Sequence, residues 1–247
     1  MYIFAFSRFS GVDKVFLCEQ KLKLSIGDIF EFAGEYYINL GTEIGDNVSN
    51  IKKISFDETQ VCLLKKNFIS KNVLKFLKIF VEEYCTTYKN ALSLFIPNND
   101  IKKLLSYKCK FCTPSYSDLI KYGNKYYFSE KFYEGQHLII VPDIWTGSNL
   151  FSGLTKDHKI FHGKDTIKNK TELFWHAKNG KVGNMISTHS QIFKDWKNLK
   201  LISILQPHKW YYKNHQDPRY DVAGVTRIMS KIYGSKIQFF EDLRLVV

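Results

Sequence analysis

The stretch GQHLIIVPDI, residues 135–144, decides the fold class of the second half of this chain. An uninterrupted apolar run that ends at a proline is typical of a strand buried on both faces, as in a parallel sheet. Similar strands are predicted at NMIST (184–188), KLISIL (200–205) and KIQFF (236–240), and a helix that ends at a glycine is predicted at TELFWHAKNG (171–180). This alternation of strand and helix predicts a parallel α/β sheet.

The first half has a different pattern, in which short β segments are separated by glycines. These segments are IFAF (3–6), KVFLCEQ (14–20), DIFEF (28–32) and EYYINL (35–40). They predict a small barrel or curled sheet.

A helix that covers one side of this sheet is predicted by apolar residues at helical spacing, which are Val73, Leu77, Phe80, Val81 and Tyr84. The cluster Pro-Asn-Asn-Asp that starts at Pro97 predicts the end of this unit. We therefore expect a β-rich domain at 1–97, a connector at 98–116 and an α/β domain at 117–247.

The composition favours a polyanionic partner, because the 36 Lys and Arg residues outnumber the 24 Asp and Glu residues and give a net charge of +12. Nucleic acid and an anionic membrane face both satisfy this charge. Only Arg8, Arg219, Arg227 and Arg244 are arginines. Lysine acts as a point charge, so contacts with phosphates are expected more than base reading.

Neither a membrane-spanning run nor a signal-peptide pattern is visible, and a cytoplasmic protein without a membrane partner is expected. The five cysteines are scattered, as in a reducing compartment. Cys109 and Cys112 have the spacing of a zinc knuckle, but a structural zinc site needs four ligands and no second pair lies nearby in the sequence. Two free thiols are the expected state of this pair, and a metal site is the alternative.

Several segments of the second half follow one another as they do in a known helicase family. VPDI (141–144) is similar to that family's V-P-E-I, FHG (161–163) stands at its L-H-S, and STHSQIF (187–193) stands at its G-T-R-S-A-x-F. WYYKNHQDPRYDVAGV (210–225) is similar to its aromatic-rich loop. From residue 135 to about 236 the chain thus resembles the first motor lobe of the primosomal protein N′ family, the PriA replication-restart helicases. The resemblance implies a RecA-like lobe.

The first half resembles the small domain that binds the 3′ end of DNA in the same family. SIGDIFEFAG (25–34) is similar to its pattern V-G-x-R-V-x-V-P-F-G, although Glu35 stands where an arginine is frequent. LKFLKIFVEEYCTTYKNALSLFIP (74–97) resembles the helix and tail that close that domain. The resemblance implies that forked or 3′-ended DNA and other replication-restart proteins are the partners.

The residues that hydrolyse ATP in this family have no counterparts here. At the position of the P-loop the chain has LIKYGNKYYFSEKF (119–132), in which only Gly123 and Lys125 remain of the glycines and lysine that hold phosphates. Leu205, Gln206, Pro207 and His208 stand at the family's D-E-E-H, and Gln238, Phe239, Phe240 and Glu241 stand at its G-S-A-T. Without the magnesium ligand and the general base, we expect no ATPase activity and no cofactor. A site completed in trans by a partner is the alternative.

Candidate DNA contacts come from two segments, and they are Thr188, His189 and Ser190 together with Trp210, Tyr211, Tyr212, Lys213, Arg219 and Tyr220. Consecutive aromatic residues beside basic ones in a turn-rich segment favour base stacking, with a place in the core as the alternative. His189 and Ala223 stand where the family has arginines. The runner-up function is a non-catalytic interaction protein that docks on replication proteins.

Overall fold

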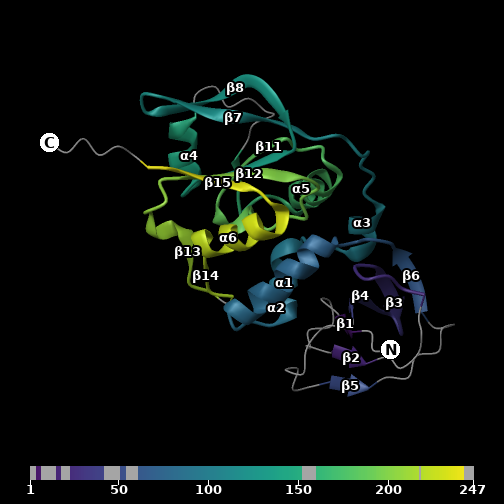
Figure 1. Cartoon of the computed structure of the whole chain (residues 1–247). Helices are drawn as coiled ribbons and strands as arrows, with labels where there is room; N and C mark the ends of the chain where they lie inside the picture. The colour runs from purple at the N-terminus through teal and green to yellow at the C-terminus, as the bar shows by residue number, and fades with distance from the viewer. Residues whose placement is uncertain are drawn as a thin grey trace. The chain divides into compact units, whose positions relative to one another are not determined.

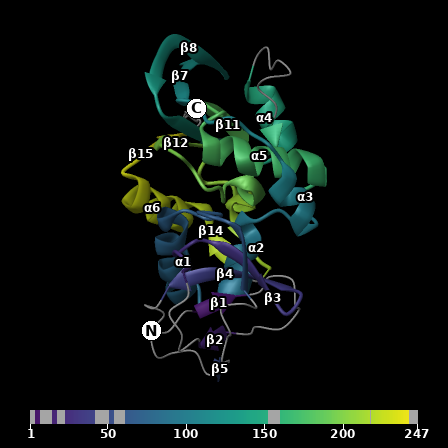
Figure 2. The same ribbon diagram turned by 90° about the vertical axis from the view of Figure 1, so that its right-hand side faces the viewer.

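A computed structural model describes residues 4–6, 15–17, 23–41, 51–53, 61–151, 160–216 and 218–241 (Figures 1 and 2). The chain divides into two compact units, Met1–Ser93 and Leu94–Val247. Within these ranges no helix combines the length and the hydropathy that are needed to span a membrane.

The first unit contains a six-stranded sheet with the order β5-β2-β1-β4-β3-β6. Its strands are β1 (Phe4–Phe6), β2 (Val15–Leu17), β3 (Ile29–Phe32), β4 (Glu35–Gly41), β5 (Ile51–Lys53) and β6 (Val61–Lys65). Neighbouring strands are antiparallel, except for the parallel pair β2 and β5. Each predicted β segment overlaps one of these strands, whereas β5 and β6 were not predicted. The described strands leave β5 and β6 at the edges of the sheet, so closure into a barrel stays a prediction.

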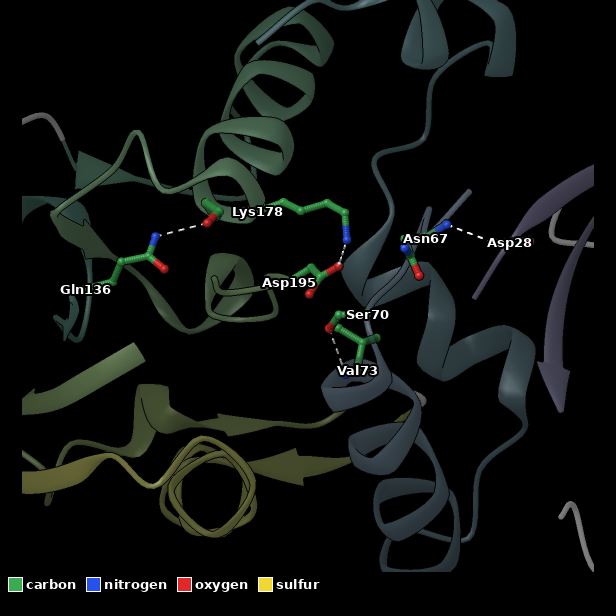
Figure 3. Close-up of polar contacts among 8 residues, drawn as sticks. Asp28, Asn67, Ser70, Val73, Gln136, Lys178 and Asp195 are labelled. Carbon is green, nitrogen blue, oxygen red and sulfur yellow. Dashed lines mark hydrogen bonds and ion pairs between the residues drawn. The ribbon is translucent and has the colours of Figure 1, made fainter. Parts of the chain in front are cut away.

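Two side-chain-to-backbone contacts stabilise this unit, one made by a buried aspartate and one by a helix cap. Asp28, which is 1% exposed, accepts hydrogen bonds from the backbone N–H groups of Ser25 at 2.9 Å and Asn67 at 2.8 Å. Figure 3 shows the bond from Asn67. The predicted helix is α1 (Lys71–Glu83), and it begins where the Ser70 side chain accepts a hydrogen bond from Val73 N. Its buried face consists of Val73, Phe76, Leu77 and Phe80, and helix α2 (Tyr88–Phe95) follows.

The second unit contains the predicted parallel sheet, whose five strands have the order β10-β11-β9-β12-β15. Four of these strands were predicted, whereas β10 was not. The strands are β9 (Gln136–Ile140), β10 (Ile160–Phe161), β11 (Asn184–Ser187), β12 (Leu199–Leu205) and β15 (Lys236–Phe240). All neighbouring pairs are parallel, which confirms the predicted α/β sheet. Its helices are α3 (Ile101–Ser106), which lies in the expected connector, α4 (Ile144–Leu150), α5 (Ile167–Asn179) and α6 (Val222–Tyr233). The assignment as a RecA-like lobe stays a prediction.

An antiparallel hairpin that the sequence reading missed precedes this sheet. Its strands are β7 (Ser115–Tyr122) and β8 (Lys125–Glu134). Leu119 and Tyr126 of the hairpin are buried against Ile139 and Val141 of the strand β9 segment. Figure 1 shows the hairpin over one face of the sheet and α6 on the other. The hairpin therefore occupies the stretch that corresponds to the P-loop. Gly123 lies in its turn, and Lys125 is the first residue of β8.

Candidate nucleic-acid interface

The segment that follows β11 holds the first group of candidate residues. Thr188 begins the 3-10 helix η2 (His189–Gln191) and is 7% exposed. Its backbone N–H donates to the Phe161 carbonyl at 3.0 Å, and its hydroxyl lies 3.2 Å from the Ser190 hydroxyl. These bonds place the segment at the carboxyl end of the sheet, with His189 and Ser190 half-buried.

His189 differs chemically from the arginine that the related family has at this position. Burial lowers the pKa of the imidazole below its ordinary value. Its Nδ1 is buried and has no hydrogen-bond partner among the described residues. A neutral imidazole cannot replace the permanent charge of a guanidinium at a phosphate, so this segment contributes little positive charge.

The aromatic-basic loop, residues 210–220, follows β12 and presents a different surface. It begins with the 3-10 helix η3 (Trp210–Tyr212), and β13 (Lys213–Asn214) pairs with β14 (Tyr220–Asp221). Trp210 is 65% exposed and Tyr211 38% exposed, with ring centroids 4.2 Å apart. Lys213 and Arg219 are exposed in the same loop. Paired aromatic rings next to cations can stack a base and contact its phosphate.

Tyr212 and Tyr220 lie in the core instead. The Tyr212 hydroxyl lies within hydrogen-bond distance of the carbonyl oxygens of Ile140, at 3.1 Å, and Leu205. The Tyr220 ring meets the Phe193 ring edge-on with centroids 5.0 Å apart. Burial raises the pKa of both phenols, so they remain protonated donors. These side chains anchor the loop, while their neighbours face solvent.

The two candidate segments are therefore neighbours at one edge of the sheet. The Tyr220 hydroxyl donates to the carbonyl of His189 at 3.5 Å, which connects the loop to η2. The buried members of the predicted set, Thr188, Tyr212 and Tyr220, have little surface with which to touch a ligand. The surface that remains consists of Trp210, Tyr211, Lys213 and Arg219, beside the half-buried His189 and Ser190.

The sequence did not predict that residues from β15 and from the segment after β12 lie next to the aromatic-basic loop. A cavity of about 420 Å³ lies beside Trp210, and His208, Asp221 and Phe239 help to line it. His208 follows β12, whereas Phe239 belongs to β15. They meet because β12 and β15 are parallel neighbours, and no sequence spacing indicates that neighbourhood.

The structure also describes the position that corresponds to the family's ATPase carboxylates and the pair Cys109 and Cys112. Leu205 ends β12 and Gln206 follows it with a φ of 52°. Cys109 is half-buried and Cys112 exposed, and both are free thiols. The described part of the chain holds no group of three or more His, Cys, Asp or Glu side chains placed to bind a metal ion.

Fold and site together define an α/β protein that carries an aromatic-basic loop at the carboxyl edge of a parallel sheet. No protein-family model matches the sequence. The Replication restart protein PriA of Thermotoga maritima is 28% identical to this chain over 105 residues, which are 40% of this chain. The aligned part covers 14% of the length of that protein. The chain is therefore similar to a small part of a PriA protein.

Proposed function

We propose that this protein binds forked or 3′-ended DNA in replication restart and does so without hydrolysing ATP. The observation that carries the proposal is the exposed pair Trp210 and Tyr211, whose ring centroids lie 4.2 Å apart, next to the exposed Lys213 and Arg219. The net charge of +12 supports a polyanionic ligand. The partial similarity to PriA of Thermotoga maritima supports the link to replication restart.

The proposed contacts divide into base stacking and phosphate binding. An unpaired base can stack on the exposed indole of Trp210 because every base has a π-face, so this contact needs no particular sequence. Lys213 and Arg219 would neutralise phosphates of the same strand and release its counterions. Affinity should then depend on both aromatic area and salt concentration.

The absence of ATP hydrolysis is proposed from the residues at the corresponding positions. Gly123 belongs to the turn of a β-hairpin, and β8 leads directly into β9 rather than into a phosphate-binding helix. Residues 205–208, at the end of β12, carry no carboxylate to hold magnesium or activate water. DNA binding would then be independent of nucleotide.

Fluorescence anisotropy with a labelled forked oligonucleotide, measured over a salt series, tests the proposal. Trp210→Ala should weaken binding by about 1–3 kcal/mol and leave the salt slope unchanged. Lys213→Ala should lower the salt slope by about one, because one phosphate contact is lost. Trp145→Ala on α4, where the indole is 77% exposed, and Lys231→Ala on α6 are matched controls that should bind like the wild type.

Unchanged affinity and salt slope in both loop variants, with circular dichroism showing that they are folded, would contradict the proposal. The interaction-protein function would then be favoured, and a specific surface supports it. The β7–β8 hairpin exposes the aromatic side chains of Tyr122, at 79%, and Phe132, at 72%, which are available as docking contacts. Docking through this hairpin should be lost in Tyr122→Ser and should show little dependence on salt.

A further inference from the structure

The cavity beside the aromatic-basic loop has an apolar floor and a basic rim. Ile204, Tyr212 and Val222 line it and are 1%, 5% and 1% exposed. The rim carries Trp210 and Phe239, which are 65% and 51% exposed. Lys209, Lys213 and His208 also line it and are half-buried or exposed. At about 420 Å³ it lies within the range of small-molecule pockets, roughly 300–1,000 Å³.

Asp221 also lines the cavity, and its carboxylate caps the N-terminus of α6. One of its oxygens, Oδ1, accepts a hydrogen bond from Gly224 N at 2.7 Å. A carboxylate has further lone pairs, so it can accept another donor from a ligand. Its negative charge and the apolar floor oppose a phosphate inside the cavity. The interior therefore suits a flat, neutral aromatic group that carries an N–H donor.

We propose that this cavity receives an unpaired nucleobase of the bound DNA strand, with a preference for bases that carry an exocyclic amino group. This inference rests on the proposed DNA binding and specifies its chemistry. The base enters between the rings of Trp210 and Phe239, and its amino group donates to the Asp221 carboxylate. Lys209 and Lys213 at the rim contact the adjoining phosphates, where positive charge is accessible to the backbone.

The energetics favour a base that is already unpaired. Extruding a base from a duplex costs its stacking and pairing free energy, and this cost is smallest for a single-stranded base. The unpaired arm of a fork or a 3′ tail supplies such bases. The cavity thus offers a physical reason for a preference for forked or tailed DNA over blunt duplex.

The test combines two readouts on forked DNA with 2-aminopurine at each unpaired position in turn. Anisotropy of a distant label reports total binding, and 2-aminopurine fluorescence reports the environment of one base. Wild-type protein should change the fluorescence strongly at one position. Ala223→Phe, which fills the cavity from its wall, should abolish that change and weaken binding at least about fivefold. Lys231→Phe places the same side chain at an exposed position of α6 and should have neither effect.

Asp221→Asn gives a second, milder variant, because asparagine is also a good helix N-cap. It should bind the fork but lose the preference for adenine over thymine at the responsive position. Two results would contradict the base-binding cavity and leave the proposed DNA binding unaffected. In the first, the wild type binds DNA without a fluorescence change at any one position. In the second, both variants behave like the wild type. No anisotropy change with any DNA overturns both. If Ala223→Phe is unfolded by circular dichroism, the Asp221→Asn result decides.

Discussion

His137 shows how much one buried side chain contributes to the second unit. Its Nδ1 lies 3.0 Å from the Ser117 carbonyl of β7, and its Nε2 lies 2.8 Å from the Ser203 hydroxyl of β12. A carbonyl can only accept, so Nδ1 carries the proton and Nε2 accepts from the hydroxyl. The neutral ring thus joins the hairpin to the central strands β9 and β12. Burial lowers its pKa to about 4.

This lowered pKa predicts that the protein is less stable in mild acid. Between pH about 6.5, where an unfolded histidine titrates, and pH about 4, the unfolded chain binds a proton that the folded chain excludes. The contribution to stability is complete above that window and is lost as the pH falls through it. Urea unfolding should show a lower free energy of unfolding at about pH 5 than at about pH 7.5, and His137 alone should account for up to about 2 kcal/mol of the difference.

The control for this pH effect is His137→Gln, which should show a smaller difference between the two pH values. His176 and His189 also have pKa values lowered by burial and add a contribution of the same sign, so the difference should shrink rather than vanish. A variant with an undiminished difference would show that His137 does not exclude the proton.

At the scale of elements, α5 is held to the segment after η2 by a partly buried ion pair. Lys178 of α5 pairs with Asp195, and their side chains are 14% and 2% exposed (Figure 3). Gln136 adds a hydrogen bond from its amide to the Ala177 carbonyl at 3.0 Å. These contacts connect α5 to β9, the central strand of the sheet, and to the segment that follows η2.

Lys178→Met should destabilise the second unit by about 3–5 kcal/mol, because the buried Asp195 carboxylate would lose the compensating charge of Lys178. The double variant Lys178→Met/Asp195→Leu should recover most of that loss, since neither charge is then buried. Urea unfolding of both variants measures the difference. Lys168→Met makes the same change at an exposed position of α5 and should cost less than about 0.5 kcal/mol. Equal losses in the single and double variants would contradict this explanation.

The elements also show where local pattern was informative and where it was overlooked. The apolar run at 138–141 predicted β9, and the glycine at 180 predicted the end of α5, where Gly180 has a φ of 78°. Both predictions depend only on residues that are neighbours in the sequence, so long-range packing does not change them. The β7–β8 hairpin carries a local signal too, since Gly123 and Asn124 form a two-residue turn between alternating residues. It was missed because the stretch was aligned with a P-loop.

For the whole molecule, we expect no ATP hydrolysis in the presence or absence of forked DNA. The reason is chemical, because residues 119–132 lack a P-loop pattern and residues 205–208 lack carboxylates. Release of inorganic phosphate measures this directly, and Lys125→Ala should be indistinguishable from the wild type. DNA-stimulated turnover that disappears in Lys125→Ala would contradict the prediction and would support a site completed by a partner.

The sequence by itself determined the parallel sheet of the second unit, the positions of β3, β4 and α1, and the excess of positive charge. Periodicity, turn residues and composition are properties of neighbouring residues, so they can be read before the chain folds. Only the tertiary structure decided that Tyr212 is buried while Trp210 is exposed, and that Asp221 and Phe239 share a cavity. These facts depend on which strand ends become neighbours in the sheet, and long-range packing selects that order.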